Sequence, residues 1–188
     1  MNTTETTKLH LFLTRGLVAI AWAVVFVAAS HSLTVGAGVL LVVYPLIDVV
    51  GSLIDARGQQ GSARRLLLAG AAVSAVAAVA LGVAATGTVA NVFAVFGVWA
   101  LLSGAAQLVV ALRRRAQLGK QWPMRLAGGV STILGVAFII ASAGTAPKLS
   151  MLALYAASGG VDFVIQAWLV ARRRRRLTRM ASPIVSAS

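Results

Sequence analysis

The sequence predicts an all-α, polytopic membrane protein whose six transmembrane helices form three repeated helical hairpins. Hydrophobic residues make up 59% of the 188 residues and charged residues only 11%, whereas soluble domains are about 45–50% apolar and about 25% charged. The apolar residues also lie in blocks of roughly 20, the length that crosses a bilayer as a helix. Arginines recur at every second boundary between blocks, as expected for hairpins that return to one side of a membrane.

The spans follow from these blocks and from the short polar segments between them. They are predicted at residues 16–29, 35–54, 66–85, 89–112, 124–143 and 149–171. Helices are expected because a helix satisfies its own backbone hydrogen bonds in lipid. The predicted domains are a cytoplasmic N-terminal tail at 1–11, a transmembrane domain at 12–171 with hairpins at about 12–57, 65–115 and 123–172, and a basic cytoplasmic C-terminal tail at 172–188.

The first span has an alternative interpretation. Lys8 and Arg15 precede a short apolar run that ends in small residues, a pattern also found in cleavable signal peptides. Removal of this segment would leave five spans and half of the first hairpin, so the membrane-spanning interpretation is preferred. The turn that follows contains His31, the one residue on its side of the membrane that is expected to titrate at mildly acidic pH.

The fifth span is expected to begin at a tryptophan–proline pair. Trp122 suits an anchor at the membrane interface. Pro123 suits the first turn of a helix, where its missing N–H is not needed. The pair comes after the longest internal loop, residues 113–122.

The charge distribution orients the chain. The net charge is +13, and in a six-span topology every lysine and arginine except Lys148 falls on one side of the membrane. By the positive-inside rule that side is the cytoplasm, so both termini are predicted to be cytoplasmic. The residues predicted to contact anionic lipid headgroups are Arg113, Arg114, Arg115, Arg172, Arg173, Arg174, Arg175 and Arg176. Nucleic acid is the alternative partner, but it is not expected because no reading element or interleaved aromatic residues accompany these arginines.

The three hairpins share a layout. Each begins with an arginine, and the second span of each carries an aromatic residue followed four positions later by a small or polar one. These pairs are Tyr44 with Asp48, Trp99 with Ser103, and Tyr155 with Gly159. Because a single repeat cannot bury its own hydrophobic face, the hairpins are expected to stack against one another.

Small residues predict close helix packing in the third span. Gly70, Ser74, Ala78 and Gly82 recur every fourth residue and so lie on one helical face. Such a stripe lets helix backbones approach closely in lipid. Spans this rich in alanine and glycine also produce the spacing by chance, and the sequence does not say which helix packs there.

Three segments of the chain resemble the HdeD family of bacterial acid-resistance membrane proteins, which are built from short membrane repeats of unknown biochemical function. They are GKQWPMRLAGGVSTILGVAFI (residues 119–139), FGVWALLSGAAQLVVALRRR (96–115) and RGLVAI (15–20). The resemblance extends over nearly the whole chain, from about Phe12 to Arg172. It implies a six-helix protein of the bacterial inner (plasma) membrane that is associated with acid stress, and it supplies no catalytic residues.

Few residues within the spans are able to carry chemistry. Asp48 lies inside the second span, where a carboxyl costs about 2.5–3.5 kcal/mol on insertion scales and is a functional candidate by default. The alternative is that Asp48 pairs with an arginine at the start of a span, or bonds to neighbouring helices, and fixes packing. The possible intramembrane polar or proton site comprises Asp48, Ser103, Gln107, Asp162 and Gln166. For this set the alternative is interhelical hydrogen bonding, worth only about 0.6 kcal/mol on average per interaction in a membrane.

The arginines at the starts of the hairpins have two interpretations. Arg15, Arg65 and Arg125 are expected to extend toward the headgroups. The alternative is a closer partner, either a carbonyl at a helix end or Asp55.

No catalytic, metal-binding or cofactor-binding pattern is present. The chain has no cysteine, two histidines and four acidic residues, and it lacks a phosphate-binding glycine loop, a metal-ligand spacing and a nucleophile paired with a base. The favoured function is therefore a non-enzymatic membrane protein of the acid-resistance type, with the bilayer, a second copy of the chain or another membrane protein as partner. The alternative is a small transporter or proton/solute channel that uses Asp48 and Asp162.

Overall fold

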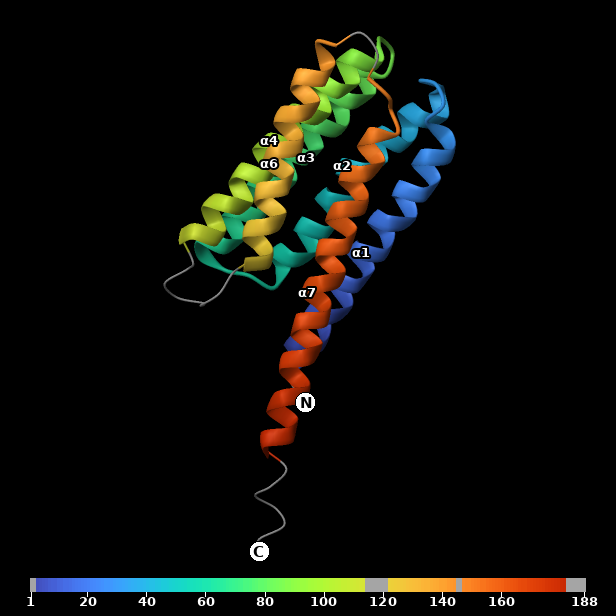
Figure 1. Cartoon of the computed structure of the whole chain (residues 1–188). Coiled ribbons are helices and arrows are strands. Elements are labelled where there is room, and N and C mark those ends of the chain that lie inside the picture. Colours follow the sequence, from blue (N-terminus) through green and yellow to red (C-terminus); the bar gives the residue numbers. More distant parts are fainter. Residues whose placement is uncertain (1–2, 114–121, 145–146, 182–188) are drawn as a thin grey trace, which may run out of the picture.

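The computed structural model describes residues 3–113, 122–144 and 147–181. These residues form six helices and no strand: α1 Thr3–Ala29, α2 Val35–Arg57, α3 Gly61–Ala84, α4 Val89–Arg113, α6 Trp122–Ser142 and α7 Met151–Ala181 (Figure 1). Each helix is long and apolar enough to cross a membrane. The predicted all-α class with six membrane-spanning helices is thereby confirmed.

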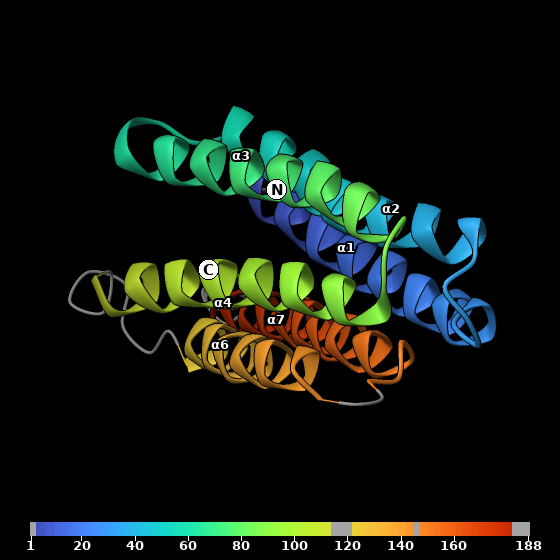
Figure 2. The same cartoon turned by 90° about the horizontal axis from the view of Figure 1, so that it is seen from above.

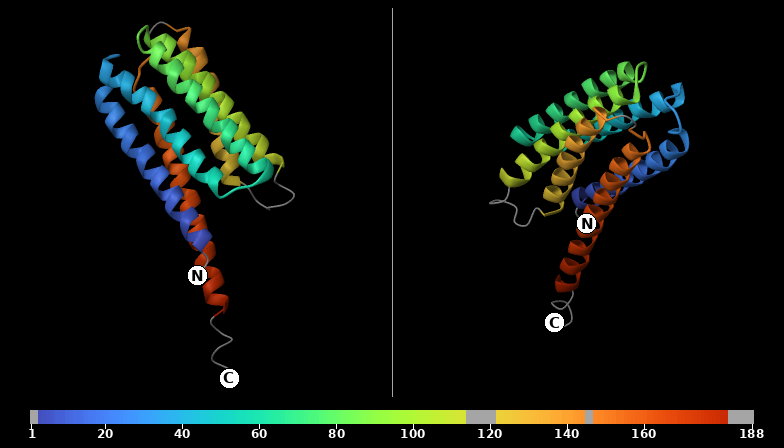
Figure 3. Two further views of the ribbon diagram at one scale, coloured as in Figure 1. Left: turned by 180° about the vertical axis from the view of Figure 1, so that it is seen from behind. Right: turned by 45° about the horizontal axis from the view of Figure 1, so that its top comes forward.

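Both terminal helices are longer than the predicted spans. α1 begins at Thr3, inside the predicted tail 1–11, and α7 continues to Ala181, well beyond Arg172. The residues that extend α7 include neither glycine nor proline, and arginine is a good helix former, so nothing ends the helix where it leaves the apolar block. The right-hand view of Figure 3 shows this part of α7 projecting past the other helices.

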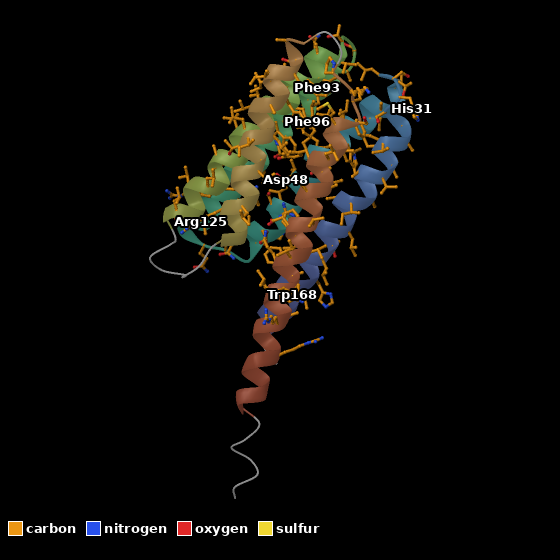
Figure 4. The ribbon with its side chains drawn as sticks, viewed as in Figure 1. His31, Asp48, Phe93, Phe96, Arg125 and Trp168 are labelled. Carbon is orange, nitrogen blue, oxygen red and sulfur yellow. The ribbon has the colours of Figure 1, made fainter. Side chains whose placement is uncertain are left out.

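The helix starts follow the local sequence. Thr34 accepts a hydrogen bond from the Ala37 N–H at 3.2 Å and caps α2, which leaves His31 exposed in the preceding turn (Figure 4). α6 begins at Trp122, with Pro123 in its first turn, as predicted. Short turns of this kind keep consecutive helices antiparallel.

The helices form a closed ring. Each helix contacts the next along the chain, and α1 contacts α7, so that the described backbones approach one another in these six pairs. Figures 1 and 2 show α1 beside α7, and Figure 1 shows both chain ends at one end of the bundle. We call this the terminal end and the opposite one the turn end.

The closest helix pairs are not the predicted hairpins. Contact is most extensive between α4 and α6, then between α1 and α7 and between α2 and α3. The pairs joined by short turns at the turn end, α1 with α2, α3 with α4 and α6 with α7, contact each other less. Each hairpin therefore packs more closely against the next hairpin than within itself, and the threefold repeat stays a prediction.

Facing glycines close two of the tight interfaces. A Cβ atom on Gly104 would lie 2.7 Å from the carbonyl oxygen of Gly128, which is closer than a side chain tolerates. The backbones touch because no Cβ separates them, as small residues allow in lipid. The facing pairs are Gly97 with Gly135 and Gly104 with Gly128 between α4 and α6, and Gly16 with Gly160 between α1 and α7.

The predicted small-residue stripe on α3 is used over part of its length. Ser74 and Ala78 are buried, and a Cβ on Gly82 would lie 3.4 Å from Val42 of α2. Nothing lies within 4 Å of a Cβ on Gly70. The stripe therefore faces a neighbour from Ser74 toward the turn end and loses contact toward the terminal end.

The apolar core lies in the half of the bundle nearest the turn end. Its largest fully buried apolar side chains are Phe26, Phe93, Phe96, Leu41, Leu81 and Leu152. Many valines, leucines and isoleucines point outward instead, with 71% of Val79 and 68% of Leu154 exposed. An apolar outer surface of this kind suits lipid, whereas in a soluble monomer it would be an unusually large exposed patch.

Candidate functional site

Arg15 is the centre of a polar cluster inside the bundle. It lies six residues beyond Leu9, the start of the apolar part of α1, which is about 9 Å along the helix. One of its terminal nitrogens, Nη2, donates to Oδ1 of Asp48 at 2.7 Å, and the other, Nη1, donates to Oδ2 of Asp55 at 3.3 Å. Both aspartates are on α2, seven residues apart and so on one face. The structure thus has two of the predicted alternatives: Asp48 pairs with an arginine at the start of a span, and Arg15 pairs with Asp55.

Two neighbours make room for the guanidinium group. A Cβ on Gly51 would lie 2.8 Å from the Cζ atom of Arg15, so any side chain at this position would displace the guanidinium. On the other side the Arg15 Cζ atom lies 4.7 Å from the ring centre of Phe163 on α7, within the range of a cation–π contact. Phe163 in turn stacks against Phe12 at 6.3 Å. Arg15 therefore occupies the junction of α1, α2 and α7.

A second oxygen of Asp48 extends the cluster to two more helices. The Ser74 hydroxyl donates to Oδ2 of Asp48 at 2.8 Å, and Nε1 of Trp99 donates to the Ser74 hydroxyl oxygen at 3.0 Å. Figure 4 places Asp48 near the middle of the bundle. The connected series Arg15, Asp48, Ser74 and Trp99 links α1, α2, α3 and α4. We call these four residues and Asp55 the Arg15 cluster.

Aromatic rings fill the interior next to this cluster, on the side of the turn end. Tyr44, Trp99 and Tyr155, the three aromatic residues of the predicted repeat, have ring centres 5.6–6.3 Å apart. Phe96 lies 5.3 Å from Trp99 and 5.2 Å from Tyr155, both edge to face. Such pairs contribute about 0.5–1.5 kcal/mol each beyond the area they bury. Aromatic rings thus fill the middle of the bundle next to Asp48, on its turn-end side.

Two further polar groups of aromatic side chains are hydrogen-bonded, the Tyr155 hydroxyl and Nε1 of Trp22. The Tyr155 hydroxyl lies 2.8 Å from the Ser131 hydroxyl, which donates to the Ala100 carbonyl oxygen at 2.9 Å when the tyrosine donates to the serine. Nε1 of Trp22 donates to the Leu40 carbonyl oxygen at 2.9 Å. These bonds join α6 to α4 and α7, and α1 to α2.

The five residues of the predicted polar site lie in three separate places. Asp48 belongs to the Arg15 cluster. On α7, Gln166 Nε2 donates to Oδ2 of Asp162 at 2.5 Å, so these two members of the set lie together on one face. Ser103 is half-buried and Gln107 exposed on α4, and neither is hydrogen-bonded through its side chain to another described residue. The structure therefore does not connect the five into one continuous polar seam.

The predicted lipid-contact arginines are described in part. The Cζ atom of Arg172 lies 5.1 Å from the ring centre of the exposed Trp168 at the terminal end, and Arg175 is exposed. The remaining residues of this set, or their side chains, lie outside the described part: Arg113, Arg114, Arg115, Arg173, Arg174 and Arg176. Their contact with anionic lipid stays a prediction.

The Arg15 cluster joins α1 to α2 through ion pairs. One guanidinium faces two carboxylates, so the ionised cluster carries a net charge of −1. The side chains of Asp48 and Asp55 are 35% and 27% exposed, against 13% for Arg15. Within the described residues no group of three or more histidine, cysteine, aspartate or glutamate side chains is placed to hold a metal ion.

The comparisons with known proteins agree with a membrane location. Residues 71–140 match a protein-family model described as a short repeat of unknown function (DUF308). The matched segment runs from α3 through α4 to α6, and it includes Ser74, Trp99 and the glycine-packed α4–α6 pair. Together with the six apolar helices, the match indicates an integral, multi-pass membrane protein. No curated protein and no solved structure matches the chain.

Sequence reasoning did not assign Ser74 and Trp99 to the polar site. Ser74 was noted as a small residue of the α3 stripe, and Trp99 as the aromatic residue of the second hairpin. The missing information was which helices are neighbours. The seven-residue spacing of Asp48 and Asp55 was the available signal, since it places two carboxyls on one helical face that needs a cation.

Proposed function

We propose that the protein is a non-enzymatic plasma-membrane protein of the acid-stress response, resembling the HdeD family, with both termini in the cytoplasm. The HdeD proteins carry the repeat that residues 71–140 match, which supports the acid-stress assignment. The concentration of arginine and lysine on the side of the termini supports the orientation.

The packing of the bundle interior is the main observation in favour of a non-enzymatic function. At the depth where a substrate site or a pore would lie, Tyr44, Phe96, Trp99 and Tyr155 contact one another. The Asp48 carboxylate, one turn from Tyr44 on α2, is engaged by Arg15 and Ser74. The interior thus serves helix packing, and activity is expected at the surface that faces lipid or partners.

The low content of acidic residues favours a fold that stays stable at low pH. Acid destabilises proteins mainly by protonating carboxylates that are paired or hydrogen-bonded in the folded state. This chain has four acidic residues in all, and Asp48 and Asp55 share one arginine. Outside the Arg15 cluster few native interactions therefore depend on carboxylate ionisation, and the rest of the bundle is expected to stay packed when the pH falls.

The function is tested by survival of acid shock. Cells that lack the protein are complemented with the wild type, with Asp48→Asn plus Asp162→Asn, or with the control Ser103→Ala, at matched abundance in the membrane. We expect all three to rescue survival. Failure of the wild type would contradict the acid-stress function. Rescue by the wild type and the control but not by the double variant would contradict a purely packing role for the carboxyls.

A small transporter or proton/solute channel is the second candidate. It is favoured by one observation, namely that the Asp48 side chain is 35% exposed although it lies within a span. The double variant above separates the two candidates, because a transport route through Asp48 and Asp162 requires at least one ionisable carboxyl there. Asp162→Asn alone is the cleaner variant, since it leaves the Arg15 cluster intact.

The orientation has its own test, which the absence of cysteine makes possible. A single cysteine replaces Ser32, which is exposed at the turn end, or Ser62, which is exposed at the terminal end. In intact cells a membrane-impermeant maleimide is expected to label Ser32→Cys and not Ser62→Cys. The reverse pattern would contradict cytoplasmic termini.

A further inference from the structure

The carboxyls of the membrane-spanning helices differ in their partners. Asp48 and Asp55 on α2 share the guanidinium of Arg15 at 2.7 and 3.3 Å. Among the described residues, Asp162 on α7 has one side-chain partner, the neutral amide of Gln166 one turn further along the same helix. It lies ten residues before Arg172, the end of the apolar part of α7, or about 15 Å along the helix.

The charged groups around Asp162 are directed elsewhere. On α1, Arg15 lies over the ring of the adjacent Phe163 but donates to the aspartates of α2. On α6, Arg125 falls on the stripe that faces α4, three residues before Gly128, which packs against Gly104. On α7 itself, Arg172 lies over Trp168, toward the terminal end.

The α6–α7 seam leaves Asp162 partly accessible. These two helices make the slightest contact of the six neighbouring pairs, and Asp162 is half-buried. Two turns toward the turn end the same face of α7 bears Tyr155, which bonds to Ser131 of α6. Asp162 and Gln166 therefore continue the helical face of α7 that bears Tyr155 toward the terminal end.

We propose that Asp162 is a proton-binding site that holds a proton at neutral pH. A carboxylate at this depth costs about 2.5–3.5 kcal/mol on insertion scales unless a cation or several donors compensate it. One neutral amide donor does not, whereas a proton removes the charge and leaves an oxygen that still accepts from Gln166. The inference is independent of the acid-stress proposal, and it names the carboxyl that would exchange a proton if the transport alternative holds.

Two measurements on the purified full-length chain in lipid vesicles at neutral pH test this site. The first is the infrared carbonyl band of a protonated carboxylic acid, which we expect in the wild type and not in Asp162→Asn. The second is labelling by dicyclohexylcarbodiimide, which adds as a whole molecule to a protonated carboxyl in an apolar environment. We expect the label on the Asp162 peptide and its loss in Asp162→Asn.

Arg15→Gln is the matched control for the reagent. It removes the cation that binds Asp48 and leaves Asp162 unchanged, so we expect more label on the Asp48 peptide while the Asp162 peptide keeps its label. Absence of the infrared band in the wild type would overturn the proposal. So would labelling of the Asp48 peptide in Arg15→Gln without labelling of the Asp162 peptide, because the reagent would then have reached that depth and found Asp162 ionised. Equal labelling of the Asp48 and Asp162 peptides in the wild type would also overturn it, because Asp162 would then not differ from the carboxyl that Arg15 binds.

Discussion

The α4–α6 and α1–α2 interfaces are held together by different means. Between α4 and α6, facing glycines bring the two backbones into contact. Between α1 and α2 the contact is slight, and two polar interactions bridge it. Arg15 binds Asp48 and Asp55 in the half nearest the terminal end, and Trp22 donates to the Leu40 carbonyl in the other half.

The difference shows two solutions to one problem of membrane proteins. Lipid tails are as apolar as the side chains, so no hydrophobic force drives helices together, and packing or polar bonds must supply the attraction. The glycine interface obtains it from close backbone approach, which tolerates no added atom. The Arg15 interface obtains it from charge, which tolerates looser packing but depends on every partner being present.

The largest expected effect comes from adding a side chain at the glycine interface. Gly104→Val would place its Cβ 2.7 Å from the Gly128 carbonyl oxygen, so α4 and α6 must separate. We expect the free energy of unfolding to fall by about 3 kcal/mol, the upper part of the range for overpacked cores. Reversible unfolding in mixed detergent micelles measures it.

Gly70→Val is the matched control for this substitution. It makes the same chemical change in the middle of an apolar helix, where nothing lies within 4 Å of the new Cβ. We expect a change within about 0.5 kcal/mol. Similar losses for both variants would show that helix propensity, and not backbone contact, explains the effect.

Removing the cation of the Arg15 cluster is expected to have the next largest effect. Arg15→Gln removes the cation that Asp48 and Asp55 share. Breaking a buried pair costs about 3–5 kcal/mol, and we expect about 2 kcal/mol here because both aspartates are partly exposed. The triple variant Arg15→Gln, Asp48→Asn, Asp55→Asn should recover part of this loss in the same unfolding measurement. A triple variant less stable than the single one would argue against the charge account.

The hydrogen-bonded part of the cluster is expected to contribute less. Ser74→Ala removes the donor to Asp48 and the acceptor for Trp99, and we expect a loss of about 1 kcal/mol. Ser103→Ala, on the neighbouring helix, removes a hydroxyl that is not bonded to another described side chain and should change stability by about 0.5 kcal/mol or less. Equal effects would remove Ser74 from the cluster.

Composition and charge were sufficient to predict the six helices. Blocks of about 20 apolar residues leave the chain no alternative to helices in lipid, and the turn at Thr34 and the start at Trp122 follow from capping and proline chemistry. The ends of α1 and α7 were not predicted, because polar residues without glycine or proline continue a helix beyond the apolar block. The aromatic residues Tyr44, Trp99 and Tyr155 were noted as a pattern, and the structure brings them together.

The candidate site was predicted by residue type but not by arrangement. A carboxyl within a span is conspicuous, so Asp48 and Asp162 were found, and Gln166 lies one turn from Asp162, a spacing that allows the hydrogen bond seen in the structure. The partners of Asp48 come from three other helices, and the ring order of those helices depends on glycine contacts such as Gly104 with Gly128 that only the folded chain displays. The hairpins were expected to stack against one another, but the sequence did not indicate that helices of successive hairpins make the most extensive contacts.

Contact between α1 and α7 closes the ring of helices. This closure places Arg15 between the aspartates of α2 and the ring of Phe163. A double variant, Phe12→Cys with Phe163→Cys, tests this directly in membranes, because the native chain has no cysteine and the two rings stack at 6.3 Å. Phe12→Cys with Val161→Cys is the control, since Val161 is exposed on the outer face of α7. We predict that a short bismaleimide cross-links the first pair within one chain and not the second. Cross-linking of neither pair within the chain, or of both equally, would contradict the closed ring.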